Sequence, residues 1–580
     1  MIGTIEQIIN NQIEVKLALD VKKTANLINL YVLIKDTNKS FIGEITELSL
    51  TKCKVNILGK LENNDFVYGF DEKPSFASVI YLLNYDFVKN IVGFKNNYLI
   101  MGKSPFYENA YINADINSLF GSHFAIFGSS GSGKSCGFTR IMQNLMKSEN
   151  MNDKPNIIIF DAYGEYAKAF NYLNNEPSFA YKTYNTDLNS NDEILLLPPW
   201  LLGVDEYALL LEANDKSQLS LIEKTLRYVN LFIKDDETVK AYKNTILAKA
   251  LLDILISGKP GPQIRDQVIG VLTKTHTDEI NLESEISEPG YYRTFRQCMR
   301  VDDHNKINAI EQVTDFLQKF IGDEVTFSLP DGTFPFTLQD VSNALEFALI
   351  DEGVWKNDSV FNMMNILKVR LDSILNSDNK KYFEYPQYIS LESYIDRILH
   401  TQNGKKAQII NFNINYVTER LGKSLVKIYS KLIFNYVTSL KERGSQPFNI
   451  IIEEAHRYVQ NDIDSDVLGY NIFERIAKEG RKYGILLGLI SQRPSEISET
   501  TLSQCNNFII FKMTHPTDIA YIKKVVPFMS EENAEKMKSI LPGNALCFGT
   551  AFKMPLLVKF EYPDPAPQSD NVNLGSVWFK

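Results

Sequence analysis

The stretch Gly128-Ser-Ser-Gly-Ser-Gly-Lys-Ser135 is the feature that most limits what this chain can fold into. It matches the G-x-x-x-x-G-K-[ST] phosphate loop in full, with a short apolar run at 124–127 before it and an amphipathic helix pattern after it. Its glycines allow the backbone to fold back so that N–H groups point inward, where the following helix N-terminus adds positive potential. The pattern therefore predicts an α/β nucleotide-binding fold.

Within this loop, Lys134 is placed to reach the β- and γ-phosphates, and the Ser135 hydroxyl is placed to bind Mg²⁺. We therefore expect ATP and Mg²⁺ as cofactors. A glycine-rich turn that matches by chance is the alternative, but the flanking strand and helix patterns weigh against it. Cys136 is included by its position, although simple packing also explains it. The predicted nucleotide-binding residues are Gly128, Ser129, Ser130, Gly131, Ser132, Gly133, Lys134, Ser135 and Cys136.

A second signal lies far along the chain, in "FNIIIEEAHRYV" at 448–459. The apolar run predicts a buried strand that ends in two carboxylates, Glu453 and Glu454. A phosphate loop requires such a partner at the end of a neighbouring strand. We expect Glu453 on the metal side of the nucleotide and Glu454 as the base that polarises the attacking water. The alternative is an exposed acidic pair at a strand end.

Two familiar classes of ATPase fit less well. "EEAH" resembles the Asp-Glu-Ala-His box of two-lobed helicases, but 319 residues separate Lys134 from Glu453 and no second nucleotide-binding lobe follows the box. An ABC-type ATPase is disfavoured because no L-S-G-G-Q-like signature is present. The spacing instead predicts one lobe that carries a long insertion.

Apolar runs that alternate with helix patterns predict a doubly covered parallel sheet, with strands in 155–166, 406–416, 483–498 and 506–513 and a long helix over 418–441. Apolar recurrence every three or four residues marks an inserted helical bundle, and the short β-rich pieces at the N-terminus suggest a small barrel. The fold class is thus α/β: a RecA-like P-loop NTPase core with an N-terminal small β-barrel and an inserted helical bundle. The predicted domains are 1–80 (barrel), 100–190 (first part of the core), 195–400 (helical insertion), 405–560 (second part of the core) and 561–580 (C-terminal tail). The tail either braces a neighbouring subunit or stays loosely ordered.

Composition limits what the protein can bind and in which compartment we expect it. The formal net charge of -10 argues against a protein that coats nucleic acid over its whole surface, but it leaves room for a basic channel inside an assembly. The five cysteines show no paired metal spacing and no disulfide framework. No secretory signal pattern is visible, and the longest apolar runs are shorter than the ~20 residues of a membrane span. We therefore expect a cytoplasmic protein without a membrane partner.

Several motifs in order carry a family resemblance: "SFIGEITEL", "GSSGSGKS", "IIIFDAYGEY", "LLLPPWLL", "IIIEEAHRYV", "IAKEGRKYGILLGLISQRPSEIS" and "LPGNALCFG". Together they resemble the HerA family of the HerA/FtsK ATPase superfamily, over about residues 1–560. This resemblance implies a homohexameric ring that uses ATP to move double-stranded DNA through its central pore.

The resemblance also implies roles for single residues. Arg481 matches the arginine finger that reaches the ATP of the next subunit, with Lys482 as a weaker candidate and a solvated basic patch as the alternative. Gln492 matches the family's polar sensor of the γ-phosphate. Asp161 matches the acidic position after the second core strand, near the metal and the nucleotide. Glu453 departs from the commoner Asp at its place.

The same resemblance suggests partners. HerA-like proteins work with a nuclease in DNA-end processing, or in bacterial anti-phage operons beside a sirtuin-like NAD-consuming enzyme or a nuclease. No such motif is present in this chain, so an effector enzyme would be another protein. A second hypothesis keeps the ATP site but makes the ring a scaffold that assembles and switches its partner without obligatory DNA translocation. The loop at 457–471 either faces the pore or, being acidic, packs against a partner.

Overall fold

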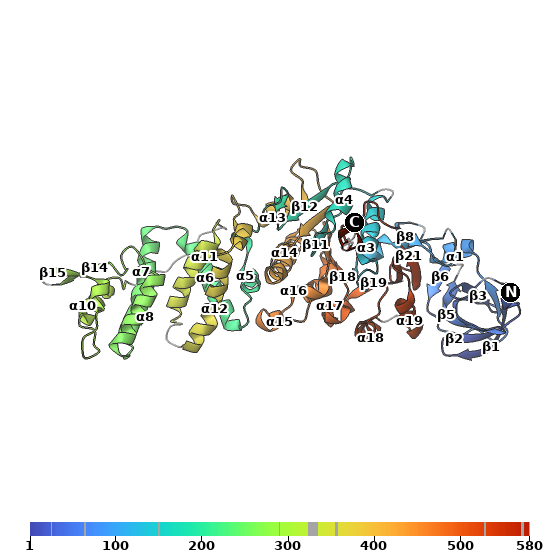
Figure 1. Ribbon diagram of the computed structural model, residues 1–580, viewed down its shortest axis with the longest axis horizontal. Coiled ribbons are helices and arrows are strands. Elements are labelled where there is room, and N and C mark those ends of the chain that lie inside the picture. The colour runs from blue at the N-terminus through green and yellow to red at the C-terminus, as the bar shows by residue number, and fades with distance from the viewer. Residues whose placement is uncertain are drawn as a thin grey trace.

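The computed structural model describes residues 1–24, 26–62, 65–94, 96–108, 110–148, 151–288, 290–322, 334–353, 358–526, 529–569 and 574–578. These residues form an elongated molecule in which a barrel, a core built on a large sheet and a helical insertion follow one another (Figure 1). This order places the sheet, which carries the phosphate loop, between the other two parts.

Six antiparallel strands close the N-terminal barrel, because β2 pairs with β5 as well as with β1. The predicted barrel is therefore confirmed, and its last strand extends two residues beyond position 80. The barrel strands are β1 (Gly3–Ile9), β2 (Gln12–Leu17), β3 (Tyr31–Lys35), β4 (Ser40–Leu48), β5 (Lys52–Glu62) and β7 (Val79–Leu82), with β6 (Asp65–Tyr68) added to β5. Helix α1 (Tyr85–Val92) leads from the barrel to the core.

The core is a sheet of twelve strands in the order β13-β12-β16-β11-β17-β18-β10-β19-β20-β21-β8-β9. The first eight run parallel, as the apolar runs predicted, and the last four extend the sheet in antiparallel fashion. The parallel strands are β13 (Glu193–Ile194), β12 (Tyr181–Asn185), β16 (Ile409–Asn413), β11 (Ile157–Asp161), β17 (Phe448–Ile452), β18 (Ile485–Ser491), β10 (His123–Phe127) and β19 (Cys505–Phe511). The antiparallel strands are β20 (Asn544–Gly549), β21 (Leu556–Lys559), β8 (Tyr98–Lys103) and β9 (Tyr111–Asp115).

Helices cover both faces of this sheet. On one face, α3 (Lys134–Met146) buries Phe138 and Met142 in a cluster with Ile159. On the other, α14 (Glu419–Ser439) begins at its N-cap Thr418 and buries Tyr429 against Phe412. The remaining core helices are α2 (Ile116–Phe120), α4 (Ala167–Phe170), α15 (Asp464–Val467), α16 (Ile472–Glu479), α17 (Glu499–Ser503), α18 (Pro516–Val525), α19 (Glu531–Ser539) and α20 (Leu574–Trp578).

The insertion between β13 and β16 is mainly helical, and it shares one continuous apolar core with the α14 face of the sheet. It also contains a two-stranded hairpin that the sequence did not predict, β14 (Glu285–Glu288) and β15 (Tyr291–Thr294). Its helices are α5 (Val204–Leu210), α6 (Lys216–Phe232), α7 (Glu237–Leu255), α8 (Gly261–Lys274), α9 (Phe295–Cys298), α10 (Ile310–Gln318), α11 (Leu338–Asp351), α12 (Asp358–Leu375) and α13 (Leu391–Leu399). Among the residues that the structure describes, no helix is long and apolar enough to span a membrane.

Gly488 in β18 provides a test of how tightly the sheet is covered. A Cβ at this position would lie 2.5 Å from Ile451 Cδ1 and 2.6 Å from Phe124 Cζ. Gly488→Val should therefore lower the free energy of unfolding by about 1–3 kcal/mol, the usual cost of overpacking. Chemical denaturation followed by circular dichroism measures this change.

Gly270→Ala on α8 is the control, since a Cβ there meets nothing within 4 Å and alanine favours the helix. This variant should be as stable as the native chain or slightly more so. Equal stability of the two variants would contradict the close packing around β18.

Candidate functional site

The phosphate loop connects β10, which lies between β18 and β19, to α3. Gly133 caps the helix with φ of 104°, and a Cβ there would approach the backbone nitrogen of Gly543 to 3.0 Å. Two backbone hydrogen bonds fasten the loop, from Gly543 N–H to Ser132 O (2.9 Å) and from Ser129 N–H to Lys512 O (2.9 Å). The loop is therefore held from outside as well as by its own glycines.

Lys134 begins α3, and its Nζ donates to Gly128 O (2.8 Å) and Ser129 O (3.1 Å). Burial lowers the pKa of Lys134, and three carboxylates, those of Glu454, Glu453 and Glu165, oppose this effect. The predicted lysine thus lies among the predicted acidic residues. Ser135 and Cys136 follow in the first turn of α3, both half-buried, while Ser129 and Ser130 lie toward the solvent side of the loop.

The acidic pair follows β17, which pairs with β11 and β18. Glu453 continues the strand, with its N–H donating to Phe160 O (3.1 Å) and its Oε1 accepting from the Tyr166 hydroxyl (3.2 Å). Burial, reinforced by the neighbouring Asp161 carboxylate, raises the pKa of Glu453 well above its usual value. Glu453 is therefore the deeply enclosed member of the pair.

Glu454 has a different environment because its backbone turns into the left-handed region, with φ of 47° and ψ of 45°. Such strain in a non-glycine residue costs on the order of 1–3 kcal/mol and is commonly found at functional sites. The turn directs the side chain toward His456 Nδ1 (3.1 Å from Oε2) and Gln492 Nε2 (3.5 Å from Oε1). Two adjacent carboxylates with separate surroundings can take separate roles.

The strand-end residues named from the sequence lie at this same edge of the sheet. Gln492 directly follows β18 and contacts Glu454, as described above. Asp161 ends β11 and is fully buried. Both of its carboxylate oxygens accept hydrogen bonds from other residues: Gly164 N–H, Glu165 N–H, Tyr166 N–H and Asn411 Nδ2. Its predicted role as a metal ligand stays a prediction.

Three residues of the site had no assigned role in the sequence analysis. Tyr166 donates to Glu453, His456 lies 3.1 Å from both Glu454 Oε2 and Ser491 Oγ, and Glu165 faces Lys134. Glu165 and Tyr166 belong to the motif "DAYGEY", and His456 belongs to "EEAH". Both motifs were visible in the sequence, but the roles of these three residues were not. Their side chains reach the acidic pair only because the loops after β11 and β17 turn back toward it.

Arg481 lies away from this edge. It belongs to the short turn Gly480–Lys482 that precedes β18, so it lies at the amino end of the strand whose carboxyl end carries Gln492. Burial lowers the pKa of His123, at the amino end of β10, to about 4, and nearby Arg481 also lowers it. At ~3.3 Å per residue, the seven residues of β18 place Arg481 more than about 20 Å from Gln492. Its side chain is exposed, as is that of Lys482.

The residues at the carboxyl edge suit a hydrated Mg²⁺ ion. Glu453 Oε2, Glu454 Oε2 and Glu165 Oε2 are buried without a hydrogen-bond partner, and the hydroxyl of Ser135, at the start of α3, lies beside the Glu165 carboxylate. In the part of the chain that the structure describes, no cluster of three His, Cys, Asp or Glu side chains is arranged to hold a metal alone. Mg²⁺ at such sites is typically bound by one or two protein oxygens, phosphate oxygens and water, so the donor set fits.

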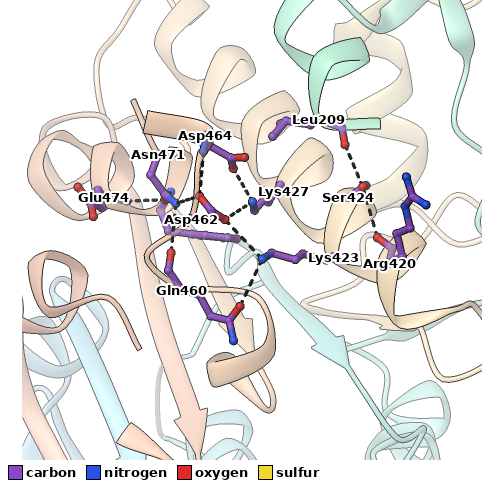
Figure 2. A network of polar contacts seen from close by, with 11 residues as sticks. Leu209, Arg420, Lys423, Ser424, Lys427, Gln460, Asp462, Asp464, Asn471 and Glu474 are labelled. Carbon is purple, nitrogen blue, oxygen red and sulfur yellow. Dashed lines mark hydrogen bonds and ion pairs between the residues drawn. The ribbon is translucent and has the colours of Figure 1, made fainter. Parts of the chain in front are cut away.

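The acidic loop after the pair packs on its own chain (Figure 2). Lys427 of α14, only 4% exposed, forms ion pairs with Asp462 and Asp464. Lys423 lies 3.6 Å from Asp462 and donates to Gln460 Oε1 (3.3 Å). These acidic side chains thus pair with lysines of the same chain, an arrangement that neither interpretation of this loop from the sequence included.

Comparisons with known proteins find a family model and relatives that are similar to this chain. A family model described as "Helicase HerA, central domain" matches residues 102–334. The probable DNA double-strand break repair helicase HerA of Methanocaldococcus jannaschii is 23% identical over 549 residues, which are 94% of this chain and 90% of that protein. The DNA double-strand break repair helicase HerA of Pyrococcus furiosus is 23% identical over 525 residues, 89% of this chain and 78% of that protein.

Solved structures are similar at a lower level. The bacterial conjugative coupling protein TrwBdeltaN70 is 11% identical, with 83% of this chain and 92% of that chain covered and a TM-score of 0.43. VirB4 of Thermoanaerobacter pseudethanolicus is 13% identical, with 81% and 97% covered and a TM-score of 0.41.

The different surroundings of the two carboxylates predict different variants. Glu454→Gln should lower kcat for ATP hydrolysis at least about 100-fold, since a general base contributes 10²–10⁴-fold, while nucleotide binding persists. Phosphate release and the fluorescence of a labelled nucleotide measure the two effects separately. Glu442→Gln, at an exposed carboxylate, is the control and should hydrolyse ATP at the native rate. A Glu454→Gln enzyme that keeps more than a tenth of native kcat would contradict the assignment.

Proposed function

Because this chain is a HerA-like ATPase of the HerA/FtsK superfamily, we propose that it works as a homohexameric ring that couples Mg²⁺-dependent ATP hydrolysis to movement along double-stranded DNA. Relatives that align with most of the chain are described as DNA double-strand break repair helicases, which supports DNA as the substrate. The phosphate loop and the adjoining carboxylates support ATP as the fuel.

The hydrolysis step follows from the surroundings of each group. Lys134 leaves its loop carbonyls for the β- and γ-phosphates, whose charge replaces those two weak acceptors. Glu454 accepts the proton of the attacking water, and the Gln492 amide beside it registers whether the γ-phosphate is present. Ser135 and Glu453 would hold Mg²⁺, which neutralises phosphate charge when bound. The loop N–H groups and the start of α3 hold the remaining phosphate oxygens.

The observation that most supports the proposed ring is the position of Arg481. An exposed arginine at the amino edge of the sheet cannot reach the phosphates at the carboxyl edge of the same subunit. No ion pair engages Arg481 among the described residues. An arginine so placed can serve a nucleotide only in a neighbouring subunit, where it stabilises transition-state charge. A closed ring gives every subunit such a neighbour.

We further propose that the ring works with an effector enzyme encoded separately, either a nuclease or a sirtuin-like NAD-consuming enzyme. The chain contains no nuclease or NAD-hydrolase motif of its own, so such chemistry requires a second protein. DNA-end processing and bacterial anti-phage defence are the two settings that fit this division of work, and both place the protein in the cytoplasm.

A scaffold is the second candidate function, in which ATP switches the assembly of a partner and DNA translocation is not obligatory. The formal net charge of -10 favours it, since a protein that grips DNA through phosphate contacts needs positive surface. In this reading the nucleotide site is the same, but the partner and not DNA controls its rate.

Steady-state ATP hydrolysis with and without linear duplex DNA separates the two functions. For a translocase we expect DNA to stimulate hydrolysis several-fold, and we expect this stimulation to decrease as salt is raised, because phosphate contacts release counterions. Glu454→Gln is the control for contaminating ATPases. Hydrolysis that depends on Glu454 but is unchanged by DNA would refute the translocase and favour the scaffold.

Arg481 can be tested by combining two inactive subunits. Arg481→Ala should lower hydrolysis by about 10³-fold, while Lys482→Ala should stay close to the native rate. Lys134→Ala should also be inactive. Co-expression of the Arg481→Ala and Lys134→Ala chains should restore measurable hydrolysis, because one subunit then supplies the phosphate loop and its neighbour supplies the arginine. Mixed rings as inactive as either parent would contradict action across the subunit interface.

A further inference from the structure

The loop after β11 carries a carboxylate, Glu165, whose surroundings differ from those of Asp161 at the strand end. Asp161 Oδ1 accepts from the N–H groups of Gly164 (2.8 Å) and Glu165 (3.0 Å). Asp161 Oδ2 accepts from Tyr166 N–H (3.0 Å) and Asn411 Nδ2 (3.1 Å). A carboxylate has about four acceptor positions, and these four donors fill them. Asp161 also lies against the Glu453 carboxyl, whose pKa it raises in addition to burial. The hydrogen bonds of Asp161 therefore hold the loop at 161–166 in its folded conformation.

Glu165 is the opposite case. The side chain is half-buried, its Oε2 has no hydrogen-bond partner, and the neighbouring charges are those of Asp161, Glu454 and Lys134. A buried charged oxygen without a partner is costly, and in native proteins it calls for a ligand, an ion or ordered water. The hydroxyl of Ser135, the predicted Mg²⁺ residue, is within hydrogen-bonding reach of the Glu165 carboxylate.

The backbone of Glu165 is fastened from the C-terminal side. After β21, residues 561–568 cross α3, where Glu561 forms ion pairs with Lys103 (3.0 Å) and Arg140 (2.5 Å). The fully buried Gln143 side chain of α3 accepts from Asp564 N–H (3.2 Å) and donates to Pro565 O (2.8 Å). Gln568 N–H then donates to Glu165 O (2.8 Å). The loop after β11 is thus held in two places: the Asp161 carboxylate binds its N–H groups, and Gln568 binds the carbonyl oxygen of Glu165.

We propose that Glu165 is a further carboxylate of the nucleotide site, which accepts hydrogen bonds from the water shell of the Mg²⁺ held at Ser135, while Asp161 only shapes the loop. This inference rests on the Mg²⁺-dependent hydrolysis proposed above. Residues that contact a metal through water or through its ligands typically change metal affinity by 10–100-fold. Glu165 therefore acts through the metal shell, and Glu454 keeps the role of base.

The test is to measure metal binding without turnover. In the Glu454→Gln background, binding of a fluorescent ATP analogue is measured first in EDTA and then at increasing Mg²⁺ concentrations. In a second experiment, electron paramagnetic resonance measures how much Mn²⁺ binds together with the nucleotide. Glu165→Gln should weaken the Mg²⁺ or Mn²⁺ dependence about tenfold. Its nucleotide affinity in EDTA and its melting temperature should match the background, and Glu165→Asp should recover part of the metal affinity.

Asp161→Asn should show the reverse pattern, because an amide nitrogen cannot accept the Tyr166 N–H. We expect a lower melting temperature, while the metal dependence of the fraction that stays folded changes less than in Glu165→Gln. Glu176→Gln, at an exposed carboxylate on the segment that follows, is the control and should match the background in every measurement.

Two outcomes would overturn the inference. One is an unchanged metal dependence in Glu165→Gln. The other is a loss of metal dependence in Asp161→Asn without loss of stability, which would make Asp161 the metal residue. If the Glu454→Gln background itself gained no nucleotide affinity from Mg²⁺, the Mg²⁺ site of the proposed function would be refuted together with this inference. If Mg²⁺ raises the nucleotide affinity of the background and the Glu165→Gln variant shows the same metal dependence, the inference alone is refuted.

Discussion

The rest of the site depends on one electrostatic arrangement, a single lysine that faces three carboxylates at the carboxyl edge of a buried sheet. Lys134 lies among Glu454, Glu453 and Glu165, and burial opposes the charge on the lysine and on two of the acids. Removing charged groups from water is costly unless opposite charge is close by, and one lysine cannot balance three carboxylates. The edge therefore favours further positive charge, which a divalent cation bound with phosphates would supply. The same imbalance explains why one carboxylate oxygen of each of these three acids is left without a hydrogen-bond partner.

The parallel topology then divides the work between the two edges of the sheet. Strands β10, β11, β17 and β18 all end at the carboxyl edge, so the phosphate loop, Glu165, the acidic pair and Gln492 converge there from distant parts of the sequence. Arg481 lies at the start of β18, and Gln492 lies at its end. One buried strand thus connects Arg481, the proposed arginine finger, with Gln492, which contacts the proposed base Glu454. Close packing around Gly488 makes this strand a stiff connection.

Most of this arrangement could be predicted from the sequence, for identifiable physical reasons. Consecutive β-branched residues in "NIII" and "NIIIF" leave no polar side for solvent and so mark buried parallel strands, and the helix predicted over 418–441 was observed as Glu419–Ser439. The phosphate loop carries its function in its own sequence. In contrast, the sequence does not tell which carboxylate of "DAYGEY" lies beside Lys134 and Ser135, because this depends on the side to which a loop folds. The sequence shows Asp161 and Glu165 only as two carboxylates of one motif. The structure distinguishes them, because Asp161 accepts four hydrogen bonds from its surroundings.

The acidic loop at 457–471 was difficult to place for a related reason, since its partners are lysines on a helix some forty residues earlier. The lysines of α14 pair with two different segments. Lys427 forms ion pairs with Asp462 and Asp464 of the acidic loop. Lys431 lies 2.5 Å from Asp205 and 3.3 Å from Glu206 of α5, at the start of the insertion. Buried ion pairs contribute little net stability compared with apolar packing, but they tolerate few alternative arrangements. The continuous apolar core beneath them already binds the insertion to the sheet. The lysines of α14 therefore hold the acidic loop and the start of the insertion against one helix, and this helix packs on the sheet that carries the site.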